Sequence, residues 1–172
     1  LAEIRRRIGY VFQDSENQLF MPTVGADVSF AAESYGYPPE EVAARTEKAL
    51  SLVKLEGQAE TAVYRLSGGQ KKRVFLARAL VQNADLFFLD EPLAGVDYRS
   101  ERAIMEKLEA LVGAGKSVVA VHHDVHTITR YFDRAVLLDG GTVQAVGEAR
   151  EVVVSEAMRK CYGEVFQAEK WL

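Results

Sequence analysis

One apolar run that ends in two adjacent carboxylates constrains the fold of this chain more than any other feature. Residues 86–89 read Leu-Phe-Phe-Leu, and Asp90, Glu91 and Pro92 follow directly. A short, continuous apolar run of this kind is typical of a buried strand in a parallel sheet. Two carboxylates at the end of such a strand are the groups that Mg²⁺ and an attacking water need in phosphoryl transfer.

A glycine-containing turn stands upstream of this strand. It consists of Leu66, Ser67, Gly68, Gly69 and Gln70, directly before a predicted helix. Backbone N–H groups that no side chain covers point at one spot there, and the helix macrodipole adds about half a positive charge. The turn is therefore predicted to bind an anion, and together the two elements indicate a nucleoside triphosphatase.

The order and separation of these motifs resemble the ATP-binding-cassette (ABC) family, and the resemblance covers nearly the whole chain. Its parts follow in family order: the Q-loop at Gln13, the signature at residues 66–70, the Walker B strand at residues 86–91, the D-loop at Asp97 and the switch histidine at His123.

The resemblance also implies an architecture, which the alternation of predicted strands and helices supports. We expect an α/β fold, a P-loop NTPase-like core with a parallel sheet, in a single ABC ATPase domain spanning residues 1–172. Residues 1–13 and 82–172 would form the ATPase core. Residues 14–81 would form a helical subdomain that carries the signature.

The P-loop pattern G-x-x-x-x-G-K-[ST] is missing from the sequence. Residues 113–117, Gly-Ala-Gly-Lys-Ser, come close, but Ala110 stands where the first glycine belongs. A predicted helix also precedes these residues and a predicted strand follows them, which reverses the P-loop order. The simpler interpretation is a glycine-ended helix with a lysine near its C-terminus. Because the chain starts at Leu1, shortly before the Q-loop, we expect an ABC ATPase that lacks its N-terminal Walker A part and is inactive alone.

Composition excludes several classes of protein. The net charge of −4 comes with no basic stripe, so no nucleic-acid partner is expected. No apolar stretch approaches the roughly 20 residues that cross a bilayer. Cys161 is the single cysteine, which rules out an internal disulfide and fits a reducing cytosol.

Local patterns predict the remaining elements. Residues 14–37 show no regular periodicity. The helix after Ser67 is expected to hold Lys71, Lys72, Arg73 and Arg78 on solvent-exposed faces, and Ser100 is a plausible N-cap. The other predicted elements are a strand at residues 8–12, a helix from residue 39 to residue 57, a buried strand at 117–121, a hairpin at 135–146 and a helical tail from 148.

The resemblance assigns roles around the nucleotide. Asp90 would hold Mg²⁺ through a water, with a helix cap as the alternative. Glu91 would be the general base, a role that typically contributes 10²–10⁴-fold. His123 would donate a hydrogen bond to the γ-phosphate. Gln13 would offer its amide oxygen to Mg²⁺ or to the attacking water.

Other residues are expected to act across a dimer interface. Ser67, Gly68, Gly69 and Gln70 would close over ATP held by a partner subunit, so that the ATP site is composite and the working unit is a two-fold homo- or heterodimer. Asp97 would reach across the same interface, with a helix-capping acid as its alternative role. ATP and Mg²⁺ are thus the implied cofactors.

The histidines allow a second interpretation. His122 and His126 have the i, i+4 spacing of metal ligands on a helix. However, no Glu stands between them in the metalloprotease pattern, and His122 is expected at the end of a strand rather than in the helix.

Two stretches point to a subfamily. Residues 12–24 resemble ATPases of energy-coupling importers for cobalt, nickel and vitamins. Residues 75–97 and 121–138 resemble ATPases of manganese, zinc and iron importers. Both imply the ATP-binding subunit of an importer for a small nutrient, most often a metal ion.

Such a subunit would lie on the cytoplasmic face of the membrane, attached through transmembrane permease subunits. Phe20, Pro22, Val24 and Tyr35 would form the groove that receives a coupling helix of the permease. The alternatives are a soluble, non-transport ABC ATPase and a fragment that cannot bind nucleotide.

Overall fold

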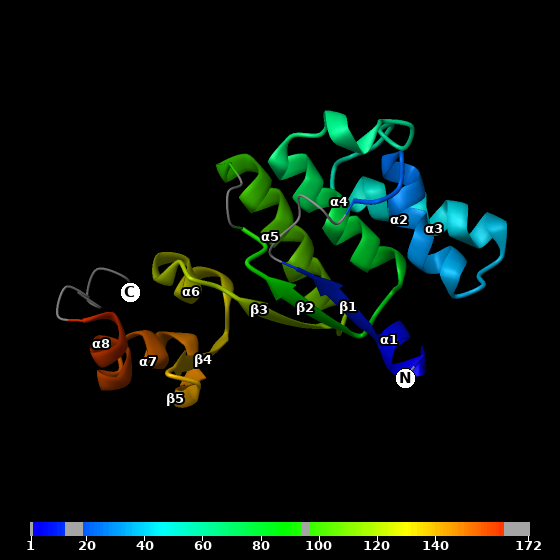
Figure 1. The fold of residues 1–172 in the computed structure, drawn as a ribbon. Helices are drawn as coiled ribbons and strands as arrows, with labels where there is room; N and C mark the ends of the chain where they lie inside the picture. The colour runs from blue at the N-terminus through cyan, green and yellow to red at the C-terminus, as the bar shows by residue number, and fades with distance from the viewer. Residues whose placement is uncertain (1, 13–18, 94–96, 164–172) are drawn as a thin grey trace. The chain divides into compact units, whose positions relative to one another are not determined.

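The computed structural model describes residues 2–12, 19–93 and 97–163, and the chain divides into two compact units. The first unit is Leu1–Val121 and the second is His122–Leu172 (Figure 1).

The first unit is built on a parallel sheet, as predicted. Its strands β1 (Ile8–Val11), β2 (Leu86–Asp90) and β3 (Ser117–Val121) lie in the order β1-β2-β3. β2 is the central strand, so the two carboxylates at its end lie between the ends of its neighbours. The α/β fold class and the parallel core are therefore confirmed.

Helices and one short 3₁₀ turn complete the first unit. They are α1 (Ala2–Arg7), α2 (Val24–Ser34), α3 (Pro39–Leu52), η1 (Val63–Arg65), α4 (Gly68–Val81) and α5 (Tyr98–Gly113). α4 and α5 pack against one face of the sheet, where Phe87 and Leu89 are buried, and α2 and α3 pack against α4 (Figure 1).

Helix α2 corrects the prediction that residues 14–37 are irregular. Thr23 caps the helix, since its hydroxyl accepts the N–H of Ala26 at 3.3 Å. The helix was missed because it buries the polar side chains of Asp27 and Ser29 beside its apolar ones, which hides the 3.6-residue period.

Asp27 and Arg78 form a buried ion pair that joins α2 to α4. The Asp27 side chain is 0% exposed and the Arg78 side chain 17% exposed, and Arg78 Nη1 donates to Asp27 Oδ1 at 3.2 Å. The other carboxylate oxygen accepts the backbone N–H groups of Phe20 and Met21 at 3.0 and 3.1 Å. One carboxylate therefore fixes the loop before α2 to the helix that carries the signature.

The charged side chains on α4 are less exposed than predicted, because Lys71, Lys72, Arg73 and Arg78 are all half-buried. Besides Arg78, Arg73 donates to the carbonyl of Lys54 at 3.2 Å and Lys72 donates to the carbonyl of Glu91 at 3.2 Å. The cause is the position of α4, which packs against α2, α3, α5 and β1, so little of its surface is left for solvent.

Strand β3 is less buried than predicted. Val119 and Val121 are 50% and 52% exposed, and they point to the same face of the sheet as the exposed ring of Tyr10. The prediction fails because the helices α4 and α5 cover the opposite face.

Helix α5 starts two residues before the predicted N-cap Ser100, because Asp97 lies at the cap position. Asp97 Oδ1 accepts the N–H of Arg99 at 3.0 Å. After the helix, Gly115 takes φ +82°, which permits the tight turn into β3. Residues 113–117 thus end a helix and open a strand, which confirms that they are no P-loop.

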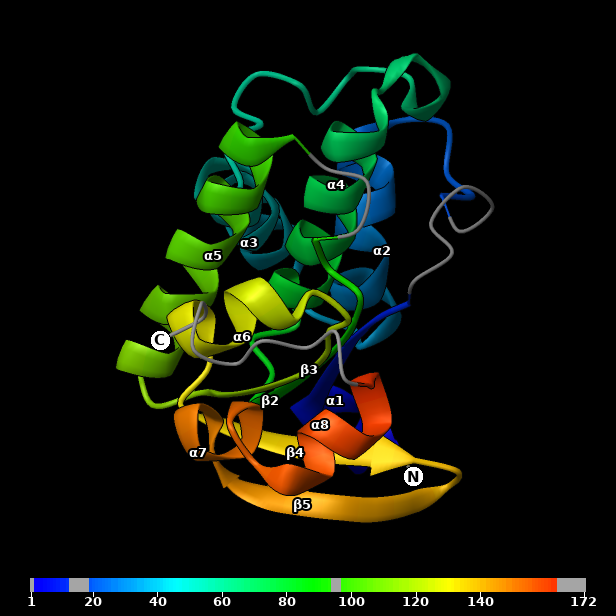
Figure 2. The same cartoon turned by 90° about the vertical axis from the view of Figure 1, so that its left-hand side faces the viewer.

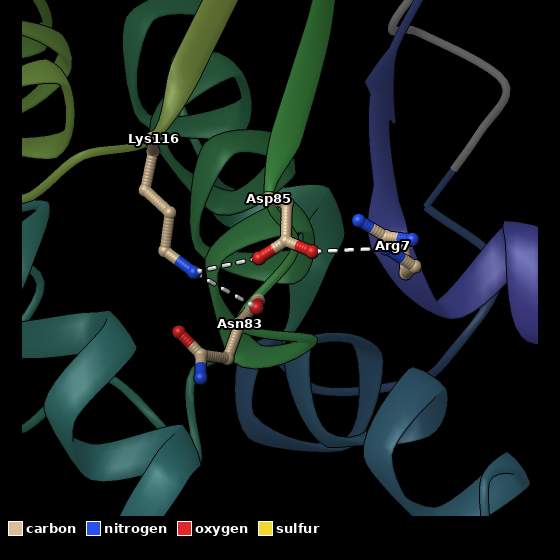
Figure 3. A network of polar contacts seen from close by, with 4 residues as sticks. All are labelled: Arg7, Asn83, Asp85 and Lys116. Carbon is tan, nitrogen blue, oxygen red and sulfur yellow. Dashed lines mark hydrogen bonds and ion pairs between the residues drawn. The ribbon is translucent and has the colours of Figure 1, made fainter.

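Lys116, the lysine of that turn, belongs to a small polar network at the start of the sheet (Figure 3). Its Nζ donates to Asp85 Oδ1 at 3.3 Å and to the carbonyl of Asn83 at 3.4 Å. Arg7 Nε donates to Asp85 Oδ2 at 3.0 Å. Asp85 therefore links residues next to all three strands at the edge opposite the acidic end of β2.

The second unit contains the predicted hairpin and the predicted helical tail. Its elements are α6 (Val125–Tyr131), β4 (Arg134–Asp139), β5 (Thr142–Glu148), α7 (Ala149–Val153) and α8 (Glu156–Tyr162). Figure 2 shows α7 and α8 against the antiparallel β4–β5 hairpin. The buried core of this unit includes Leu137 and Met158. Gly140 and Gly141 make the hairpin turn with φ of +54° and +75°. Of the helices that the structure describes, none has the length and apolarity to span a membrane.

Candidate functional site

The acidic site lies where the sequence predicts it, at the carboxyl end of β2. Asp90 is the last residue of the strand and pairs in register with Val121, the last residue of β3. Asp90 and Glu91 are both half-buried, and both line a small cleft. This is the edge of an open parallel sheet at which ligands bind.

Glu91 has a strained backbone. Its φ is +47°, the left-handed region, which an L-residue enters at a cost of about 1–2 kcal/mol. Two contacts hold it there: its N–H donates to the carbonyl of Val121 at 3.1 Å, and its own carbonyl accepts from Lys72 Nζ at 3.2 Å. The buried Pro92 follows. Strain of this kind, when contacts from two other elements maintain it, is common at catalytic positions.

The ammonium group of Lys72 is perturbed by this location. Burial lowers the pKa of Lys72 below its ordinary value of 10.5, and the negative charge of Glu91 partly opposes this effect. Lys72 lines a small cleft together with Phe75, Leu89 and Pro92. A cation thus reaches the acidic loop through apolar surroundings.

The signature turn forms the N-terminus of α4. Ser67 Oγ accepts the N–H of Gln70 at 3.3 Å, and Gln70 Oε1 accepts the N–H of Ser67 at 2.9 Å, which together make a capping box. A Cβ on Gly68 would meet no atom within 4 Å. The first turn of the helix is thus ordered and open to an approaching anion.

Within this chain Asp97 is a helix-capping acid, which is the alternative role considered for it. It is exposed and caps α5 through Arg99, as described above. A role across a dimer interface stays a prediction.

The histidines lie in the second unit. His123 is exposed in the segment between β3 and α6. Its predicted contact with the γ-phosphate stays a prediction. His122 Nε2 lies 2.5 Å from Thr127 Oγ1, and its ring contacts that of Phe132 at a centroid distance of 5.5 Å. His122 precedes α6 and so lies outside that helix, as predicted. Within residues 2–12, 19–93 and 97–163 no group of three or more His, Cys, Asp or Glu side chains could hold a metal ion.

Gln13 lies outside the described residues. One residue of the site was missed by sequence reasoning, namely Lys72. Its helical position relative to the buried Phe75 and Leu76 would have placed it near the apolar side of α4, a signal that its charge concealed.

The chain is similar to known proteins in sequence and in fold. Residues 1–94 match the family described as "ABC transporter". The zinc transport system ATP-binding protein TroB of Treponema pallidum is 41% identical over 165 residues, which are 92% of this chain and 61% of TroB.

Two solved structures are similar as well. That of cbiO1 from Clostridium perfringens, part of the ABC transporter complex cbiONQ, is 34% identical with a TM-score of 0.80, over 92% of this chain and 64% of cbiO1. The dimeric ATP-binding cassette MJ0796, bound to ADP and Pi after hydrolysis, is 31% identical with a TM-score of 0.76, over 87% of this chain and 66% of MJ0796.

The chain thus spans about three fifths to two thirds of the length of these relatives. The predicted resemblance to ATPases of metal-ion and energy-coupling importers is confirmed. From the capping-box signature, the acidic end of β2 and the match over residues 1–94, it follows that the chain belongs to the ABC transporter family.

Proposed function

We propose that this chain is the catalytic and signature-bearing part of an ATP-hydrolysing subunit of an ABC importer. The observation that carries the proposal is the pair Asp90 and Glu91 at the carboxyl end of the central strand, with Glu91 held in a left-handed conformation. Because these 172 residues contain no P-loop, ATP binding needs a P-loop from outside them. We call this chain together with that segment the complete ATPase.

The residues at the end of β2 fit Mg²⁺. This ion prefers oxygen ligands and is usually held by one or two carboxylates, with water and substrate phosphates completing its shell. Asp90, half-buried at the strand end, supplies such a carboxylate, and Gln13 would supply an amide oxygen. Bound Mg²⁺ neutralises charge on the phosphates.

Glu91 accepts the proton of the attacking water in this proposal. Glu91 is half-buried and its backbone is held on both sides, which fixes the direction of its Cα–Cβ bond. His123 donates a hydrogen bond to the γ-phosphate and keeps water and phosphate in line.

The second half of the site comes from a partner subunit. The open N-terminus of α4, with Ser67, Gly68, Gly69 and Gln70, carries the positive end of the helix dipole, and the N–H groups of Gly68 and Gly69 take no part in the capping box. We propose that this turn contacts the phosphates of ATP held by the partner and that Asp97 lies in the same interface. The dimeric state of the similar cassette MJ0796, bound to ADP and Pi, supports this arrangement.

The proposed cargo is a divalent metal ion, because TroB is named as part of a zinc transport system. The membrane path then belongs to permease subunits on whose cytoplasmic side this chain lies. Phe20 supports a docking role, since it is 57% exposed and packs edge-on against the exposed Phe30 at 4.9 Å. Val24, which the sequence placed in the same groove, is fully buried and takes no part.

A single substitution tests the proposal. In the complete ATPase, Glu91→Gln should retain ATP binding and lower the rate of phosphate release by a factor of about 10²–10⁴. Glu109→Gln, which neutralises an exposed acid on α5, is the matched control and should retain full turnover. Unchanged turnover in Glu91→Gln would remove Glu91 from its role. Failure of both the wild-type complete ATPase and the variant to bind ATP would contradict the proposal.

A further inference from the structure

We propose that Lys72 is a positioning residue for Glu91, through which the signature helix sets the orientation of the general base in the same subunit. The inference rests on the proposed function of Glu91. It concerns how the strained backbone of that residue is maintained.

The carbonyl of Glu91 is the group that Lys72 contacts. Lys72 Nζ lies 3.2 Å from this oxygen, and the N–H of the same residue donates to Val121 on β3 at 3.1 Å. One peptide unit on each side of the Glu91 Cα is thus anchored to a different element. With φ fixed at +47°, the direction of the Cα–Cβ bond is fixed too, and with it the region that the carboxylate reaches.

The surroundings of Lys72 favour a fixed contact over a loose surface one. Lys72 lines a small cleft together with Phe75, Leu89 and Pro92, which restricts the rotamers of its side chain. A partly buried ammonium group forms a stronger hydrogen bond to a carbonyl than one in bulk water does. Burial lowers the pKa of Lys72, in agreement with a location partly removed from water.

The position of Lys72 on α4 connects the signature turn to Glu91. Ser67 caps α4, and Lys72 follows five residues later, about 7.5 Å along the helix axis. The tip of α4 would contact ATP held by the partner, whereas Lys72 contacts the base that acts on the subunit's own ATP. A displacement of the helix by the partner's nucleotide would therefore reach Glu91 directly.

The test uses truncation of the lysine in the complete ATPase. Lys72→Met keeps the aliphatic stem and removes the ammonium group, so the fold should persist while the Glu91 carbonyl loses its donor. We expect kcat for ATP hydrolysis to fall about tenfold or more, since a misplacement near 1 Å can cost about a hundredfold. The KM for ATP and the dissociation constant of ATP should change by less than about threefold. Lys72→Arg, which also offers N–H donors, should recover most of the rate.

Lys71→Met is the matched control, because it removes the same charge from the neighbouring position of the helix. Its kcat should stay near that of the wild type. Equal losses in Lys71→Met and Lys72→Met, or an unchanged kcat in Lys72→Met, would overturn the inference. If Lys72→Met does not fold, Lys72→Ala with the same readouts replaces it.

Glu91→Gln, measured in parallel, separates this inference from the function beneath it. Adding Lys72→Met to Glu91→Gln should lower the residual rate no further, because both changes act on the same group. If Glu91→Gln alone keeps full turnover, the proposed function fails. If Glu91→Gln is inactive and Lys72→Met is fully active, only the positioning role fails.

Discussion

Removal of the Asp27 carboxylate should destabilise the first unit more than any other single change to an acidic side chain described above. This carboxylate is 0% exposed and has three donors: the N–H groups of Phe20 and Met21, and Arg78 Nη1. Asp27→Ala would leave two backbone donors in a region that water does not reach easily.

The magnitude follows from these contacts. A hydrogen bond to a charged group contributes about 1.5–3 kcal/mol, so the two backbone donors alone account for about 3–6 kcal/mol. Removing one partner of a buried ion pair costs about 3–5 kcal/mol in measured cases. The two estimates describe overlapping effects and are not added. We therefore expect the free energy of unfolding to fall by about 3–5 kcal/mol.

The assay is urea unfolding followed by circular dichroism, together with hydrogen exchange of the backbone amides of Phe20 and Met21. Both amides should exchange faster in Asp27→Ala, because they lose their acceptor. Glu47→Ala, which removes an exposed acid on α3, is the control and should change stability by less than about 0.5 kcal/mol. A loss below about 1 kcal/mol with unaltered exchange at both amides would refute this account of Asp27.

Two further predictions concern the signature and the network at the start of the sheet. Ser67→Ala should lower the free energy of unfolding by about 1 kcal/mol through loss of the cap, whereas Ser67→Gly should lower it by only a few tenths of a kcal/mol. Thermal melts should therefore separate the two variants. ATP-driven dimerisation of the complete ATPase, measured by sedimentation, should weaken in both. Equal melting of the two variants would contradict the capping role. The hydrogen bond from Arg7 and then that from Lys116 lower the pKa of Asp85 below its ordinary value of 3.8. As pH falls, Asp85 therefore takes up its proton in the unfolded chain before it does so in the folded chain. Its contribution to stability is complete above pH 3.8 and is lost as pH falls through the pKa of Asp85 in the folded state. An NMR titration of the Asp85 carboxyl carbon should have its midpoint below 3.8, and a midpoint at or above it would disprove the contacts in Figure 3.

Local signals in the sequence predicted most of the elements that position the site. The apolar run at β2 and its terminal acids predicted a parallel strand, and the structure confirms it. The turn at Ser67 predicted a helix start, and the capping box is present. These features depend on neighbours within a few residues, which is why periodicity and capping rules identify them.

The missed features depend on contacts between distant parts of the chain. Asp27 and Arg78 are 51 residues apart, so neither the burial of the acid nor that of its partner leaves a local pattern. Lys72 and Glu91 are 19 residues apart, and the left-handed backbone of Glu91 follows from its contacts instead of its residue type. A charged side chain on a helix is usually exposed, and that rule fails where neighbouring helices surround the helix.

The reciprocal hydrogen bonds between Ser67 and Gln70 have a consequence for how nucleotide would be recognised. Because they exist in the isolated chain, the turn loses its conformational entropy during folding and not during capture of a phosphate. The turn is a preorganised receptor, so encounter with a partner's nucleotide needs no local ordering step there. The slow step in the closure of two such subunits would then be a rigid-body motion of the subunits. The rate at which they meet should depend on ionic strength, because no loop has to become ordered first.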